Sequence, residues 1–141
     1  MVVHRPREEV FGFLADLETW SRWQPGLWES EQTSRGSMDV GTTFRLALDV
    51  SSQRIEVLCE VTEYEENEKL EFHYARDGLS LGLGYYLESV GDYTRITGKG
   101  EGHMSGFSGL FEPIVTREVN EHIKTSLKDL KSLLESRVPE A

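Results

Sequence analysis

The chain has 141 residues, of which 25 are Asp or Glu and 15 are Lys or Arg, so its formal net charge at pH 7 is −10. A protein that grips a nucleic-acid backbone or an anionic membrane surface needs clustered positive charge, so this composition argues against both partners. The length predicts a single domain over residues 1–141, large enough to bury a core without disulfides or metals.

The cysteine content and the N-terminus indicate where the protein works. Its one cysteine, Cys59, cannot form an internal disulfide. The opening sequence MVVHRPREEV contains no apolar run of the kind found in signal peptides. No stretch approaches the roughly 20 apolar residues that a membrane-spanning helix needs. We therefore expect a cytoplasmic protein.

The first elements of the chain are predicted to be two short helices. Pro6 suits a first helical turn, acidic residues follow it, and apolar residues at helical spacing continue to about Leu17. A second helix is predicted from Glu18 to Gln24, and Pro25-Gly26 ends it.

From Leu27 to Met104 the hydrophobic period changes to two. The alternating residues are Phe44, Leu46, Leu48 and Val50; Ile55, Val57, Cys59 and Val61; Leu70, Phe72 and Tyr74; and Leu79, Leu81, Leu83, Tyr85 and Leu87. Residues typical of tight turns separate these runs, as in Asp77-Gly78 and Gly91-Asp92. The pattern predicts an antiparallel meander with one buried and one polar face.

The last predicted element is one long helix from about Gly109 to Ser136. Its apolar residues recur every three or four positions, and at 1.5 Å per residue it spans about 40 Å. The apolar stripe rotates by more than about 100° along the helix, counting about 100° per residue. Such a rotation suits a helix that is wrapped by a strongly coiled sheet.

Several motifs together carry a family resemblance. They are Pro6-Arg-Glu-Glu-Val-Phe with Leu14-Ala-Asp16, Trp20-Ser-Arg-Trp23-Gln-Pro-Gly26, Val40-Gly41-Thr42, Tyr86-Leu87-Glu88, Tyr93-Thr94-Arg95-Ile96-Thr97 and Glu112-Pro113-Ile114-Val115. In order and spacing they resemble the START-like (SRPBCC) superfamily, of the polyketide cyclase/dehydrase and lipid-transport type. The resemblance implies an α+β helix-grip fold, in which a curved antiparallel sheet wraps around a long C-terminal helix, with two short N-terminal helices.

We expect either that the first strand of that fold is abbreviated here, or that the natural chain begins upstream of Met1. Only Met1 to His4 precede the first predicted helix. A shortened first strand leaves part of the sheet edge open, and open edges pair readily with other chains. We therefore expect homodimerisation, and a protein-interaction module that uses this edge is one alternative function.

The space between the sheet and the last helix is either filled core or a ligand cavity. Three glycines, Gly98, Gly100 and Gly102, are predicted to face it. They let the sheet curl and the helix dock, or they leave room for a ligand, and the two explanations are compatible. Aromatic residues on the same face suit a small-molecule pocket, although a plain core requires the same pattern.

The expected partner is a hydrophobic or aromatic small molecule, such as a lipid, a quinone or a polyketide-like compound. The candidate ligand-binding residues are Trp23, Phe44, Leu46, Phe72, Tyr74, Leu83, Tyr85, Gly98, Gly100, Phe107, Phe111, Ile114 and Val115. Of these, Trp23 and Phe107 lie on segments where we expect the pocket mouth.

A cyclase or dehydratase that acts on such a ligand is the other alternative. Glu118 and His122, four residues apart on the last helix, are candidate catalytic residues together with Tyr74. Exposed, the Glu118–His122 pair contributes little, whereas burial shifts both pKa values toward acid–base use. The resemblance assigns no catalytic residue, since the family is not taken to share one fixed catalytic motif.

Neither a metal nor a cofactor is expected. The four histidines are scattered without metal-ligand spacing, and Cys59 stands alone on an apolar face. The glycines at 98, 100 and 102 sit on a predicted strand, so they do not form a dinucleotide-binding loop. The acidic excess is concentrated at residues 56–71, on the predicted outer face of one hairpin and away from the pocket.

Overall fold

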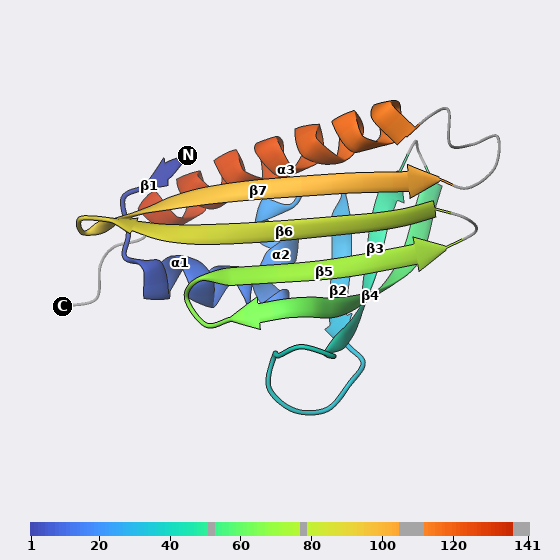
Figure 1. The fold of residues 1–141 in the computed structure, drawn as a ribbon, viewed down its shortest axis with the longest axis horizontal. Coiled ribbons are helices and arrows are strands. Elements are labelled where there is room, and N and C mark those ends of the chain that lie inside the picture. Colours follow the sequence, from blue (N-terminus) through green and yellow to red (C-terminus); the bar gives the residue numbers. More distant parts are fainter. Residues whose placement is uncertain (51–52, 77–78, 105–111, 137–141) are drawn as a thin grey trace.

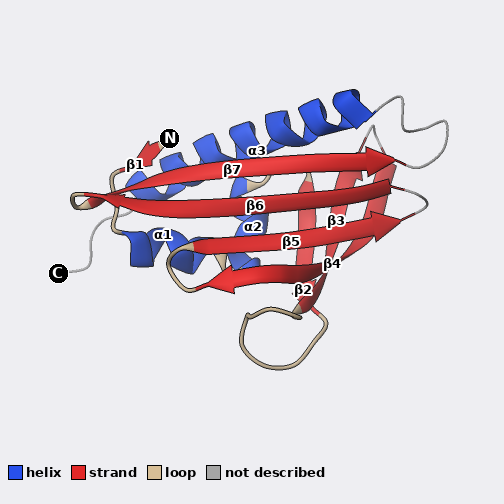
Figure 2. Cartoon of the chain, viewed as in Figure 1, coloured by secondary structure: helices blue, strands red, loops and turns tan. Residues whose placement is uncertain are grey.

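Seven strands form one antiparallel sheet in the order β1-β7-β6-β5-β4-β3-β2. The structure is a computed structural model that describes residues 1–50, 53–76, 79–104 and 112–136. Its elements are β1 (Val2–Val3), α1 (Arg7–Leu14), the 3-10 helix η1 (Leu17–Thr19), α2 (Trp20–Trp23), β2 (Leu27–Gln32), β3 (Thr43–Val50), β4 (Gln53–Glu65), β5 (Lys69–Arg76), β6 (Leu79–Val90), β7 (Tyr93–Met104) and α3 (Glu112–Glu135). Figures 1 and 2 show the helices behind the sheet, so one face is covered and the other is open.

The strand register confirms the predicted meander and its two faces. Leu83 pairs with Gly100 and Tyr85 pairs with Gly98, as the alternation requires if all four face the helices. The turn between β4 and β5 places Asn67 at φ 63°, and the turn between β6 and β7 places Gly91 at φ 62°. Both angles lie in the left-handed region that Asn and Gly tolerate best.

The N-terminal helices are shorter and more broken than the sequence predicts. Helix α1 ends at Leu14 rather than near residue 17, and residues 17–23 form a 3-10 turn followed by α2. Two side chains explain the break: Asp16 accepts a hydrogen bond from the Glu18 amide, and Thr19 Oγ1 donates to the carbonyl oxygens of Phe13 and Asp16. Such local bonds compete with helix continuation.

Helix α3 closes the covered face of the sheet. Its stripe of buried residues is Ile123, Leu127, Leu130 and Leu134. The long C-terminal helix is thus confirmed, while its predicted start at Gly109 lies outside the described residues. Among the helices in the described part of the chain, none is long and apolar enough to cross a membrane.

Helix α3 also closes much of the sheet edge that the sequence predicts to be open. Strand β1 pairs with β7 at Arg95 and Thr94, and the neighbouring Met1 exchanges backbone hydrogen bonds with Ile96. Beyond it, the Gly100 amide donates to Asn120 Oδ1 at 3.0 Å, and Asn120 Nδ2 donates to the Gly100 carbonyl at 2.8 Å. The amide and carbonyl of Gly102 are likewise bonded to Thr116 Oγ1. Two helix side chains therefore substitute for a neighbouring strand, and the expectation of an open edge is wrong at these two residues.

Candidate functional site

Part of the covered face is filled by an aromatic cluster, defined as Trp20, Trp23, Phe44, Phe72 and Tyr85. Ring centroids within it lie 5.3 to 6.3 Å apart, mostly in edge-to-face or tilted arrangements. Such arrangements are the ones that aromatic pairs prefer. All five side chains are buried, and both indole nitrogens donate hydrogen bonds inside the protein. Trp23, expected at a pocket mouth, therefore packs in the core.

The aromatic cluster contrasts with an aliphatic wall on the same face. We define the aliphatic wall by six partly buried residues: Leu48, Ile55, Leu79, Leu81, Leu83 and Val119. Strand alternation places the five strand residues toward the helices, and they extend to the end of the sheet where β6 and α3 begin (Figure 1). Leu46 and Tyr74, two further predicted ligand residues, are buried beside it. The wall is therefore apolar but less completely covered than the cluster.

The inward glycines do not leave empty space, because α3 occupies it. A Cβ added at Gly98 would lie 2.4 Å from Ile123 Cγ2, and one added at Gly100 would lie 2.3 Å from Val119 Cγ1. Real Cβ atoms do not approach so closely. At these two positions the structure shows the docking role that the sequence left open as one of two explanations.

The predicted catalytic residues occupy different environments. Glu118 is exposed, whereas His122 is partly buried and its Nε2 lies 3.4 Å from Oγ of the fully buried Ser126. Burial lowers the pKa of His122, which favours the neutral imidazole. Tyr74 belongs to a different element, strand β5, where it is buried and pairs with Leu81 of β6. The three side chains therefore differ in burial: Glu118 is exposed, His122 is partly buried and Tyr74 is buried.

Four predicted ligand residues lie wholly or partly outside the described residues. Phe107 and Phe111 lie outside the described residues. Ile114 and Val115 belong to the backbone of α3, but their side chains are also outside the described part.

Two buried titratable groups in the core stay protonated at neutral pH. Burial raises the pKa of the Cys59 thiol to about 12, so it stays protonated. Burial likewise raises the pKa of Tyr85 above its usual value. Among the described residues, no three His, Cys, Asp or Glu side chains gather in a way that could hold a metal ion.

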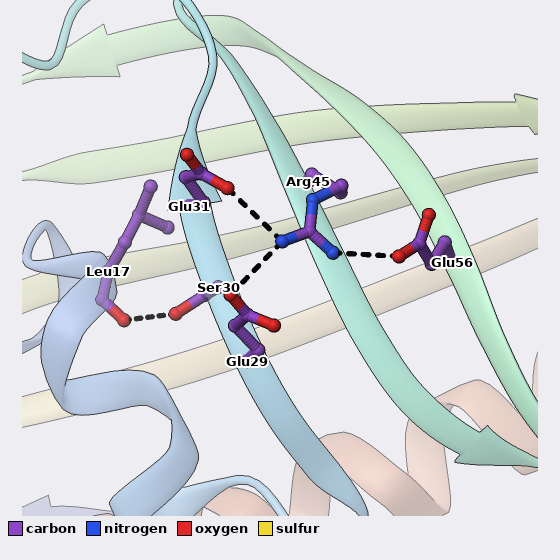
Figure 3. Close-up of polar contacts among 6 residues, drawn as sticks. All are labelled: Leu17, Glu29, Ser30, Glu31, Arg45 and Glu56. Carbon is purple, nitrogen blue, oxygen red and sulfur yellow. Dashed lines mark hydrogen bonds and ion pairs between the residues drawn. The ribbon is translucent and has the colours of Figure 1, made fainter.

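The open face of the sheet carries charge instead of apolar cover. On β3, Arg45 lies within 3.0 to 3.1 Å of three carboxylates, those of Glu29, Glu31 and Glu56 (Figure 3). One guanidinium group therefore forms ion pairs with three carboxylates, so this group of four charged side chains is net negative. The nearby Leu58, paired with Arg45 across the strands, is 68% exposed.

A hollow of about 630 Å³ on the open face was not anticipated from the sequence. Its lining residues are Thr62, Glu71, Phe72, His73, Gly82, Leu83, Gly84, Tyr86, Lys99, Gly100, Glu101 and Asn120. The sequence signal was the alternation Leu81-Gly-Leu-Gly84, in which the glycines face away from the helices. The leucines of that alternation predict the covered face, whereas the glycines between them mark the hollow on the open face.

Comparison with known proteins identifies a family and a fold. The family model "Polyketide cyclase / dehydrase and lipid transport" matches residues 1–135. A search of curated proteins gave no match.

Solved structures with this fold are similar along nearly the whole chain. A START superfamily protein from Mycobacterium smegmatis has a TM-score of 0.80 at 16% identity, covering 96% of this chain and 93% of its own. The Zhui aromatase/cyclase from Streptomyces sp. R1128 has a TM-score of 0.76 at 14% identity, covering 99% and 92%. The protein TTHA0849 from Thermus thermophilus has a TM-score of 0.77 at 19% identity, covering 97% and 96%. At such low sequence identity it is the TM-scores that show a shared helix-grip fold.

Proposed function

Because the chain belongs to the polyketide cyclase/dehydrase and lipid-transport family, we propose that it binds a hydrophobic small molecule between its sheet and α3. The aliphatic wall carries this proposal. Six apolar side chains on a covered face would normally be buried completely, since each gains about 1.5 to 3 kcal/mol by full burial. Here they remain partly exposed, beside a core of buried side chains.

The chemistry of the wall favours an uncharged ligand. Its side chains are aliphatic, and Thr116 and Asn120 on the neighbouring helix turn are already bonded to the β7 edge. A carboxylate or phosphate buried against this surface would lose its hydration without gaining a partner there. A lipid chain, a quinone or a neutral polycyclic compound fits these conditions.

The proposal is tested with N-phenyl-1-naphthylamine, a neutral apolar probe that fluoresces when it leaves water. Leu81→Gln places an amide on the aliphatic wall, and we expect it to weaken probe binding about tenfold, which corresponds to roughly 1.4 kcal/mol. Leu58→Gln makes the same change on the open face, where the leucine is 68% exposed, and serves as the matched control. Equal affinities for both variants, with circular dichroism showing both folded, would contradict the proposal.

An enzyme of the cyclase or dehydratase class is the second candidate function, and His122 favours it. A half-buried imidazole with a lowered pKa is neutral at pH 7 and can accept a proton. Glu118 is exposed, so the proposed acid–base pair would reduce to His122 alone. On this alternative, His122→Gln abolishes turnover of a bound substrate and leaves probe affinity unchanged, whereas unchanged turnover excludes the role.

A further inference from the structure

Strand β6 bears two glycines on the open face of the sheet. Gly82 and Gly84 alternate with Leu81, Leu83 and Tyr85, which face the helices. Glycine weakens a strand interior, and in strands it often marks close approach of a ligand or of another backbone. Each of these two positions therefore needs a physical reason.

Gly84 is explained by a neighbouring side chain, whereas Gly82 is not. A Cβ added at Gly84 would lie 2.5 Å from Tyr86 Oη, so the tyrosine ring folds over this glycine. The Tyr86 hydroxyl donates a hydrogen bond to Glu71, which fixes the ring there. An aromatic side chain that covers a strand glycine is a known stabilising arrangement. A Cβ added at Gly82 would meet no atom within 4 Å.

The uncovered glycine belongs to the hollow of about 630 Å³ described above. Its floor is the bare β6 backbone at Gly82, next to the Tyr86 ring that covers Gly84. Glu71 and His73 line it from β5, and Lys99 and Glu101 line it from β7. Each pair faces the other across β6, since Glu71, Gly84 and Lys99 share one row and His73, Gly82 and Glu101 share the next.

The charges around the hollow restrict what it can bind. Lys99 Nζ lies 5.6 Å from the centroid of the Tyr86 ring and forms no ion pair with any carboxylate in the described part of the chain. Two carboxylates, those of Glu71 and Glu101, also line the hollow. A free anion is repelled by this pair, while a neutral oxygen can still accept a hydrogen bond from Lys99.

We propose that this hollow binds a flat, uncharged ring compound that carries a hydrogen-bond acceptor. The ring lies on the bare backbone at Gly82 with its edge against Tyr86, and the acceptor oxygen faces Lys99. This site is on the opposite face of the sheet from the aliphatic wall, so it goes beyond the proposed function and does not depend on it.

The test uses coumarin, a neutral bicyclic compound with a carbonyl oxygen, in a titration followed by NMR of the ¹⁵N,¹³C-labelled protein. We expect saturable shifts at the Gly82 and Gly84 amides and at the Lys99 side chain. Naphthalene, which has the same ring size without an acceptor, and coumarin-3-carboxylate, which adds a negative charge, should both bind at least several-fold more weakly.

Two variants separate the site from general effects on the fold. Gly82→Val puts a side chain into the hollow at a position where an added Cβ meets no atom within 4 Å, and it supplies a residue that strands favour. It should abolish the shifts while the melting temperature stays equal or rises, and Gly12→Ala in α1 is the control that leaves the hollow intact. Lys99→Met keeps the side-chain stem and should weaken coumarin about tenfold.

Three results would overturn the proposal. One is coumarin binding that persists unchanged in both Gly82→Val and Lys99→Met. Another is a set of shifts confined to the methyl groups of Leu79 and Leu81, which do not line the hollow and would assign the compound to the aliphatic wall. The third is the absence of shifts up to the solubility limit of coumarin. Since the probe-binding test of the proposed function uses Leu81 and a different compound, the two proposals fail independently.

Discussion

The covered face of the sheet contains two regions that differ in how completely they are packed. In the aromatic cluster, five buried rings contact one another and both indole N–H groups have partners. In the aliphatic wall, six side chains of similar hydrophobicity remain partly exposed. Hydrophobic character alone therefore does not distinguish a core residue from a binding-surface residue, whereas the exposed fraction of its side chain does.

The largest expected effect comes from the aromatic cluster. Trp20→Ala removes a fully buried indole that contacts three other rings, and we expect a loss of about 3 to 5 kcal/mol in the free energy of unfolding. Leu81→Ala on the aliphatic wall should cost only about 1 to 2 kcal/mol, because that side chain is already partly exposed. Urea denaturation measures both, and equal losses would remove the distinction between the two regions.

An intermediate effect is expected where α3 docks on β7. Gly100→Ala forces a Cβ against Val119, and overpacking of this kind costs about 1 to 3 kcal/mol. The double variant Gly100→Ala with Val119→Ala should recover part of the loss. Gly82→Ala is the matched control, since nothing lies within 4 Å of the added atom. If thermal melting shows the same cost for both glycines, close helix docking is not what selects Gly100.

The smallest effect concerns His122. Its pKa is lowered from the ordinary 6.5 by burial, so the unfolded chain takes up a proton at a higher pH than the folded protein. The free energy of unfolding is therefore unaffected by this group above about pH 6.5, and the group lowers it as the pH falls below that value. Between pH 7 and pH 5.5, wild-type protein should lose more of its free energy of unfolding than His122→Gln. Parallel pH dependences would indicate that His122 is not desolvated.

The strand pattern of the sequence was sufficient to predict the sheet and its faces. Alternation over β6 and β7 places Tyr85 and Gly98 on the same side, and their pairing follows from a tight turn at Gly91. Periodicity reports which face a residue lies on, and in an antiparallel meander the turns then determine the register.

The contacts that the side chains make on each face are harder to predict from the sequence. Trp23 was expected at a pocket mouth, yet α2 directs it against Tyr85 in the core. The bonds from Asn120 and Thr116 to the β7 edge depend on how a helix lies in space. In the sequence, a polar residue on a helix is normally expected to face solvent, so no local pattern predicts such a contact.

The central claim is that a hydrophobic ligand occupies the aliphatic wall. The most direct test is NMR of protein with ¹³C-labelled leucine methyl groups, titrated with N-phenyl-1-naphthylamine. We predict saturable shifts and intermolecular contacts at Leu48, Leu79, Leu81 and Leu83, with little change at Leu14 and Leu134 in the packed core. Shifts confined to Leu58 on the open face, or no shifts at any leucine, would contradict the claim.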